Sequence, residues 1–165
     1  MMSGNELRSL YESVIKQSGH PDPVGYMARA LAFSDANADY LDIEGKQGFM
    51  PVHPDRALKE VGAKNVSILE NNIPATLAMD MLYFDQFGRI EDMVVAFHEG
   101  IDAVGNPSDE MRELLDNLPE LRKSMTEIVA PRLATVDDVI SILTKTKPPN
   151  TNRLDAFKQI LRSVN

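Results

Sequence analysis

The chain has 165 residues, of which 43% are hydrophobic, so it can bury the core of one compact domain and is not a disordered chain. It contains no cysteine, which excludes a disulfide framework, a thiolate metal site and a cysteine nucleophile. The net charge is −8, with 16 acidic and 8 basic side chains in residues 1–106 and 9 of each in residues 107–165. This balance argues against a surface for nucleic acid or anionic lipid.

The first third of the chain predicts two helices and a loop. Apolar residues at helical spacing predict a helix over residues 7–15, which Gly19 can end. A second helix follows over residues 23–33, with Asp22 as its cap and a proline at its first position. Residues 34–50 have no long period and predict a loop with at most a short hairpin.

The middle of the chain predicts three helices, each stopped by a glycine. A short helix covers residues 54–61, a longer one runs from about residue 73 to residue 87, and a third covers residues 90–99. The two longer helices are apolar enough to lie at the centre of the fold.

The last third predicts four more helices, over residues 109–115, 119–129, 136–143 and 152–164, with a linker at residues 147–150. No internal repeat or low-complexity tract is present. The predicted fold class is therefore all-α with at most a small β element.

Four local features carry a resemblance to a known family. They are Ala32-Phe33-Ser34 at a helix end, Gly48-Phe49-Met50-Pro51 before the short helix that ends at Gly62, Asn71-Asn72-Ile73, and Val95-Ala96-Phe97-His98-Glu99-Gly100. In this order and spacing they resemble the soluble lytic transglycosylases and goose-type lysozymes, over roughly residues 5–105. The resemblance implies a lysozyme-like helical domain over residues 1–105, with a saccharide cleft, and a C-terminal helical extension over residues 106–165.

The positions that resemble the family's site differ from it in their polar side chains. Phe33 stands where the family has its catalytic glutamate, whereas Ser34 beside it matches. Pro51 replaces a glutamine, Phe97 a tyrosine and His98 an asparagine. The family cuts peptidoglycan with one carboxyl that acts as acid and then as base, and a phenyl ring can do neither. The resemblance therefore implies a lysozyme-like fold without a catalytic residue.

The resemblance also gives the residues that line the cleft: Phe33, Ser34, Met50, Pro51, His53, Phe97 and His98. Phe33 and Phe97 are expected to face each other and fill the cleft with apolar contacts.

Two carboxylates could replace the missing acid. Asp35 lies two residues beyond Phe33, which on a helix is a rotation of about 200°, so a cap or loop role is favoured. Glu99 lies in the segment that would border the cleft, although a solvent-facing helix end is favoured. His53 and His98 lack the spacing of a zinc-binding pair, so we expect hydrogen-bonded histidines, no metal and no cofactor.

Three functions follow from these expectations. The favoured one is a non-catalytic structural or assembly protein on a lytic-transglycosylase-like fold, of the kind carried by bacteriophage virions. The alternative is a peptidoglycan-cleaving transglycosylase or lysozyme that uses Asp35 or Glu99. A weaker alternative is peptidoglycan binding without cleavage. The acidic first two thirds favour the structural role, because cell-wall polymers are largely anionic.

The C-terminal helix offers a contact for other subunits of an assembly. Its apolar stripe consists of Leu154, Phe157, Ile160 and Leu161, flanked by basic residues. The stripe either docks on a partner or packs back on its own domain. The first residues lack the basic and apolar regions of a signal peptide, and no apolar run approaches the roughly 18 residues that a membrane span needs, so we expect neither feature. We therefore expect the protein in the virion if a phage encodes it, and otherwise in the cytoplasm.

Overall fold

The computed structural model describes residues 2–34 and 45–130, and within them the predicted all-α class is confirmed. These residues form no strand, and the small β element is an isolated antiparallel bridge between Gln47 and Val52. The helices are α1 (Gly4–Leu10), α2 (Pro23–Ser34), α3 (Pro54–Val61), α4 (Leu69–Phe87), α5 (Ile90–Glu99) and α6 (Asp109–Val129). A π-helical stretch, Tyr11–Ile15, continues α1, and a 3-10 turn, Ile101–Ala103, follows α5.

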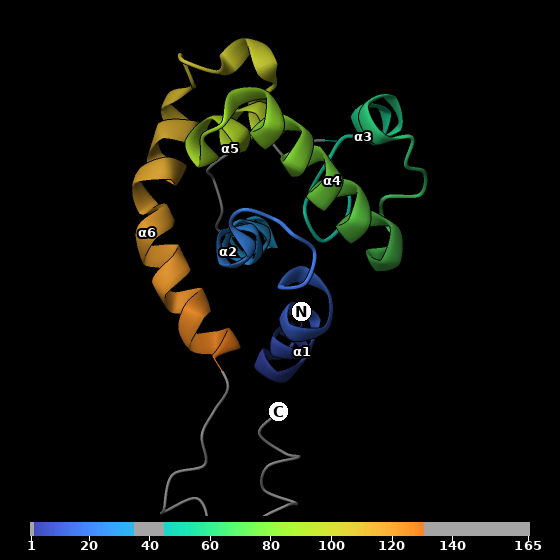
Figure 1. The fold of residues 1–165 in the computed structure, drawn as a ribbon, viewed down its shortest axis with the longest axis vertical. Helices are drawn as coiled ribbons and strands as arrows, with labels where there is room; N and C mark the ends of the chain where they lie inside the picture. Colours follow the sequence, from blue (N-terminus) through green and yellow to red (C-terminus); the bar gives the residue numbers. More distant parts are fainter. Residues whose placement is uncertain (1, 35–44, 131–165) are drawn as a thin grey trace, which may run out of the picture.

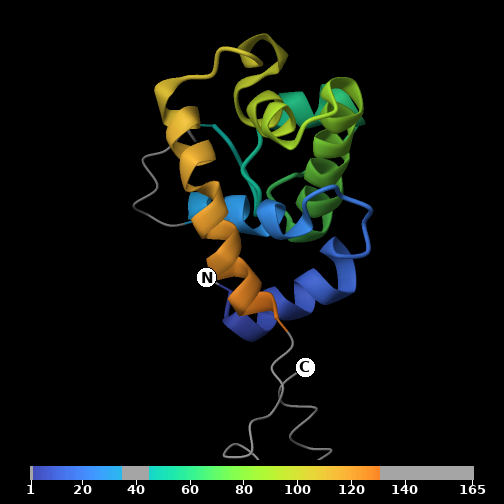
Figure 2. The ribbon, with the colours of Figure 1, turned by 60° about the vertical axis from the view of Figure 1, so that its left-hand side comes forward.

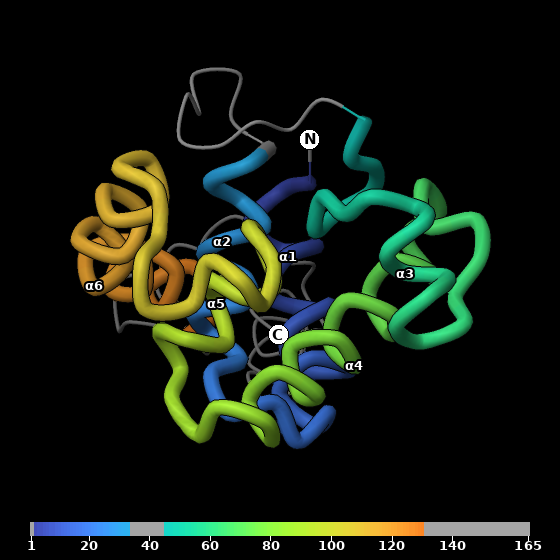
Figure 3. The backbone as a smooth tube through the Cα atoms, turned by 90° about the horizontal axis from the view of Figure 1, so that it is seen from above, coloured from blue at the N-terminus to red at the C-terminus, as the bar shows by residue number. Residues whose placement is uncertain are grey.

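Helix α2 lies at the centre of the described residues (Figure 1). Helix α6 runs along one side of α2 and reaches α1 with its C-terminal end, as the turned view in Figure 2 also shows. Helix α4 packs against α5 on one side and α3 on the other. Viewed from above in Figure 3, α3 and α6 lie at opposite edges of the molecule.

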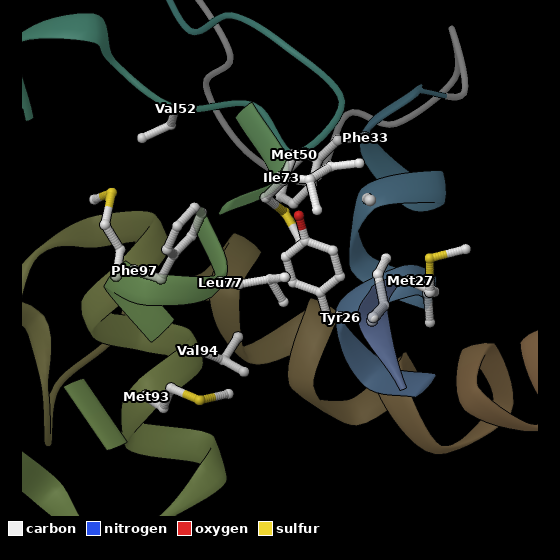
Figure 4. Packing of buried hydrophobic residues seen from close by; sticks show 14 of the residues in the cluster. Tyr26, Met27, Phe33, Met50, Val52, Ile73, Leu77, Met93, Val94 and Phe97 are labelled. Atoms are coloured by element: carbon white, nitrogen blue, oxygen red, sulfur yellow. The ribbon is translucent and has the colours of Figure 1, made fainter. Parts of the chain in front are cut away.

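The hydrophobic core forms where α2, α4 and α5 meet the turn at residues 47–52. Figure 4 shows Tyr26 of α2 among side chains of Met50, Ile73 and Leu77. Tyr26 and Met50 are completely buried, and Leu114 brings α6 into the same cluster. The core therefore spans α6 as well as the helices that precede it.

Several helix ends lie where glycine and proline predict them. Asp22 caps α2, because its Oδ1 accepts the backbone N–H of Gly25 at 3.1 Å. Helix α3 begins at Pro54 and ends before Gly62, which has a left-handed backbone. Helix α5 has the predicted bounds, Ile90–Glu99.

Helix α4 begins at Leu69, four residues before the predicted start. The apolar period becomes visible only at Ile73, because Asn72 in the first turns is polar. Asn72 is nevertheless completely buried, since its side chain bonds to the turn at residues 47–50. The apolar period therefore does not extend into the first turn of α4, and the predicted start falls one turn too late.

Helix α6 is continuous where the sequence predicted two helices divided at Pro119. A proline inside a helix removes one backbone hydrogen bond and disfavours the preceding turn. Leu114, Leu118, Met125 and Val129 are all buried on one face of the helix. This burial along both halves outweighs the local cost of the proline. The helices predicted over residues 136–143 and 152–164 lie outside the described residues.

Gly48 makes the closest backbone approach in the 47–52 turn. Its φ is +96°, and a Cβ at this position would lie 2.1 Å from Nδ2 of Asn72 and 2.3 Å from the carbonyl oxygen of Val66. Asn72 holds the turn from the other side, accepting the N–H of Met50 at 2.8 Å. A side chain at residue 48 is therefore excluded both by strain and by space.

Replacing Gly48 by alanine should lower the free energy of unfolding by about 2–4 kcal/mol, because overlap with Asn72 adds to the strain of the positive φ. Gly62→Ala is the matched control, since its φ is +68° but nothing lies within 4 Å of an added Cβ. The control should lose about 1–2 kcal/mol. Urea denaturation followed by circular dichroism measures both, and equal losses would contradict the prediction.

Candidate functional site

A pocket of about 640 Å³ opens between the N-terminal residues, the end of α2, the 47–52 turn and the start of α4. We call it the Phe33 pocket. Its lining consists of Met2, Leu7, Leu31, Phe33, Gly48, Phe49, Pro51, Ser67 and Leu69. Its size suits a small ligand or several apolar side chains of a partner, and none of the described residues that line it is charged.

The residues that resemble the family's cleft are distributed over three environments. Phe33 and Pro51 line the Phe33 pocket. Met50 and Phe97 are buried in the core, with exposed fractions of 0% and 1%. His53 is half-buried and precedes the first residue of α3.

Two further predicted residues lie at the end of α2. Ser34 is its last residue, and Asp35 lies outside the described residues. The structure thus brings Phe33 and Pro51, but not His53, to the pocket.

His98 lies directly behind Phe33. The phenyl rings of Phe33 and Phe97, predicted to face each other, both pack against its imidazole, with centroid distances of 4.7 and 4.8 Å. The guanidinium of Arg29 lies over the ring of Phe97 at 5.3 Å. Phe33 therefore separates the apolar pocket from a polar group in the core.

That polar group is a network centred on Arg29 of α2 and Asp80 of α4, both with 0% exposure. The guanidinium donates from Nη1 to Oδ2 of Asp80 at 2.9 Å and from Nη2 to Oδ1 at 3.1 Å. Its Nε donates to Nε2 of His98 on α5 at 3.0 Å. Three helices are thus joined through one side chain, and such a two-pronged pair is among the strongest hydrogen-bonded contacts.

The hydrogen bonds assign opposite tautomers to the two buried histidines. The backbone N–H of Asp22 donates to Nδ1 of His20 at 2.9 Å, so the proton of His20 is on Nε2, which donates to Oδ2 of Asp80 at 2.7 Å. His98 accepts at Nε2 from Arg29, so its proton is on Nδ1. Both rings are neutral in this arrangement, and Arg29 and Asp80 neutralise each other.

The pKa values follow from burial and from these neighbours. Burial lowers the pKa of His98 well below 6.5, and the positive charges of Arg29, Lys46 and Arg56 lower it further. Burial alone would raise the pKa of Asp80, but Arg29 and His20 outweigh it and the pKa lies below 3.8. Asp80 is therefore ionised, enclosed and unable to exchange protons with a substrate in the pocket.

Glu99, the second candidate for a displaced catalytic acid, holds the start of α6. Its Oε1 accepts the backbone N–H of Ser108 at 2.9 Å, and its Oε2 accepts the Ser108 hydroxyl. Ser108 in turn caps α6 by accepting the N–H of Met111. The carboxylate is thus engaged in a structural contact and does not line the Phe33 pocket.

Arg56 and Lys46 hold the C-terminal end of α5, and sequence reasoning did not identify them. Arg56 donates to the carbonyl oxygens of Ala96 and Phe97, and Lys46 donates to that of His98 at 3.3 Å. These carbonyls belong to the last turn of α5, where that of Ala96 also accepts the N–H of Gly100, and cations at this end are favoured by the helix dipole.

A sequence signal for the buried network did exist. Asn72, Thr76 and Asp80 follow one another at intervals of four residues on α4, and all three have 0% exposure. Arg29 likewise interrupts an otherwise apolar helix. A polar stripe on a helix that is apolar elsewhere indicates buried partners, but it does not identify them.

The described residues contain no cluster of three or more His, Asp or Glu side chains that could hold a metal ion. None of the helices in this part of the chain is both long and apolar enough to cross a membrane.

No protein-family model, no curated protein and no solved structure matches this chain.

Replacing Asp80 by asparagine should lower the free energy of unfolding by about 3–5 kcal/mol, because it leaves the buried charge of Arg29 without a counterion. Glu91→Gln is the control, since its pair with Arg89 is 68–69% exposed and should be worth less than about 1 kcal/mol. Guanidinium chloride denaturation measures both variants. A loss for Asp80→Asn no larger than the control's would contradict the network's role.

The free energy of unfolding should decrease as the pH falls below 6.5. Unfolded His98 binds a proton near pH 6.5, whereas buried His98 stays neutral, so acid favours the unfolded chain. Between about pH 7.5 and about pH 5.5, proton binding by unfolded His98 should lower the free energy of unfolding by about 1 kcal/mol. Protonation of Asp80 should lower it further below pH 3.8. Denaturant midpoints at each pH measure the decrease.

His98→Gln is the matched variant, because a glutamine oxygen can accept from Arg29 but does not titrate. Its stability should decrease less than that of the unmodified chain over the same pH interval. Parallel curves for the two proteins would assign the pH dependence to other groups.

Proposed function

We propose that the protein is a non-catalytic structural or assembly protein built on a lytic-transglycosylase-like scaffold. The observation that carries this proposal is Phe33, at the position that resembles the family's catalytic acid. Its side chain is 6% exposed, lines the pocket and packs against His98. A phenyl ring there cannot transfer a proton to a glycosidic oxygen.

The surroundings of Phe33 support the same proposal. Asp80, in the buried network behind Phe33, is enclosed by Arg29 and His20, and Glu99 is bound to Ser108. The pocket wall is apolar. A saccharide presents many hydroxyl groups, which an apolar wall would desolvate without replacing their hydrogen bonds.

The proposed partners are other protein subunits, contacted through Leu154, Phe157, Ile160 and Leu161, which lie outside the described residues. The proposed setting is the virion if a phage encodes the protein, and otherwise the cytoplasm. Peptidoglycan is a weaker candidate ligand, bound without cleavage. No cofactor is part of the proposal.

The alternative is a muralytic transglycosylase or lysozyme that uses a displaced carboxylate. Its remaining candidate is Asp35, because the chain passes from the pocket residue Phe33 to Asp35 within two residues. An assay on cell wall separates the two functions.

The purified protein should release no soluble muropeptides from peptidoglycan sacculi, measured by mass spectrometry of the supernatant beside a known lysozyme. Asp35→Asn and Glu99→Gln should be equally inert, and Phe33→Glu tests whether restoring a carboxylate gives cleavage. Circular dichroism verifies that each variant is folded. Release by the unmodified protein that is lost in Asp35→Asn or Glu99→Gln would establish the muralytic alternative.

Two further readouts separate the remaining roles. Cosedimentation of the inert protein with sacculi would favour peptidoglycan binding over assembly. If the gene lies in a phage genome, mass spectrometry of gradient-purified virions should detect the chain at a fixed ratio to other virion proteins. Its absence from those particles would contradict the assembly role.

A further inference from the structure

We infer that the Phe33 pocket is occupied by the C-terminal stripe of the same chain, formed by Leu154, Phe157, Ile160 and Leu161. Of the nine described residues that line the pocket, seven are apolar and the other two are Gly48 and Ser67. Such a wall selects an occupant that brings apolar side chains and no buried charge. The stripe presents four large apolar side chains within eight residues.

The position at which the described chain ends favours this occupant. Nε of Arg8 on α1 donates to the carbonyl oxygen of Ile128 at 3.2 Å, so the end of α6 lies against α1. Leu7, the neighbour of Arg8, lines the Phe33 pocket. The chain therefore leaves α6 beside one wall of the pocket.

The linker is long enough for the stripe to reach the pocket of its own molecule. Residues 131–153 separate the end of the described chain from Leu154, and an extended chain spans about 3.3 Å per residue. Two segments of one chain that can reach each other meet at an effective concentration that can be in the millimolar range. In dilute solution the chain's own stripe therefore outcompetes that of a second copy.

The charges of the two parts are complementary. The described residues carry 18 acidic and 11 basic side chains, whereas residues 131–165 carry three acidic and six basic ones. Two exposed carboxylates lie next to pocket residues: Glu6 precedes Leu7, and Glu70 follows Leu69. The basic residues beside the stripe thus approach an acidic surface.

The contact has a consequence for the proposed assembly role. A stripe held in its own pocket is unavailable to partners until one of them displaces it, so assembly would begin only on that exchange. This consequence rests on the proposed function. The intramolecular contact itself does not, because it can be measured on the isolated chain.

The absence of cysteine permits a direct test with the full chain. Ser67→Cys, in the pocket lining, and Ser163→Cys, beside the stripe, are spin-labelled together, and the distance between labels is measured by pulsed dipolar spectroscopy. Excess unlabelled protein ensures that only labels on one molecule are counted. A short, narrow distance distribution is expected.

Matched substitutions identify the contact. Leu69→Asp places a charge in the pocket and should abolish the short-distance population, whereas Leu82→Asp on the same helix, 46% exposed and outside the pocket, should leave it unchanged. Phe157→Asp should also abolish it while leaving the pocket residues intact. Circular dichroism shows whether the variants are folded. If Leu69→Asp does not fold, Phe157→Asp still tests the contact.

Two results would overturn the inference. A long, broad distribution in the unmodified background would show that the stripe does not occupy the pocket. A short distance that appears only when the unlabelled protein is left out would assign the pocket to the stripe of a second copy. Either result leaves the assembly proposal standing, because that proposal depends on the sacculus and virion measurements.

Discussion

The bidentate pair between Arg29 and Asp80 is the interaction on which the arrangement of the helices depends. Taking both charges out of water costs several kcal/mol per ion, and the cost is offset only if every remaining donor and acceptor is satisfied. His98 accepts the Nε–H of Arg29, and His20 donates to the carboxylate. Among the described residues, no buried side-chain nitrogen or oxygen lacks a hydrogen-bond partner. A shift of α2 relative to α4 would leave a buried charge without its counterion, and a shift of α5 would leave the Nε–H of Arg29 without its acceptor. The network therefore favours one packing of these three helices.

This constraint also determines what the Phe33 pocket can be. The hydrogen bond from Arg29 fixes the orientation of the His98 ring. Phe33 packs against this ring on one side and lines the pocket on the other. The polar groups of the core are therefore turned toward one another and away from the pocket. The described wall of the pocket is apolar apart from Gly48 and Ser67 and contains no titratable side chain, so it favours apolar groups by desolvation.

The sequence predicted the fold where local chemistry decides it and failed where long-range packing does. Proline and glycine gave the bounds of α3 and α5, because caps and left-handed backbone act within a few residues. Pro119 was a misleading signal, because burial of α6 against α2 outweighs its local preference. The partners of Arg29 could not be predicted from the sequence, because they lie 51 and 69 residues away in the chain. The polar stripe on α4 and the single arginine in the apolar α2 indicated that such partners existed, but not which residues they were.

The residues that carry the family resemblance divide into two groups with different physical roles. Gly48 permits the close approach of the turn to Asn72, and Asn72 bonds that turn to α4, so both act on the backbone. The exchanged positions, Phe33 and Pro51 among them, present side chains to the pocket. A turn held by Gly48 and Asn72 supports a saccharide cleft or an apolar docking pocket equally well, because it fixes shape and not chemistry. The turn therefore determines the shape of the pocket, whereas Phe33 and Pro51 determine that its wall is apolar.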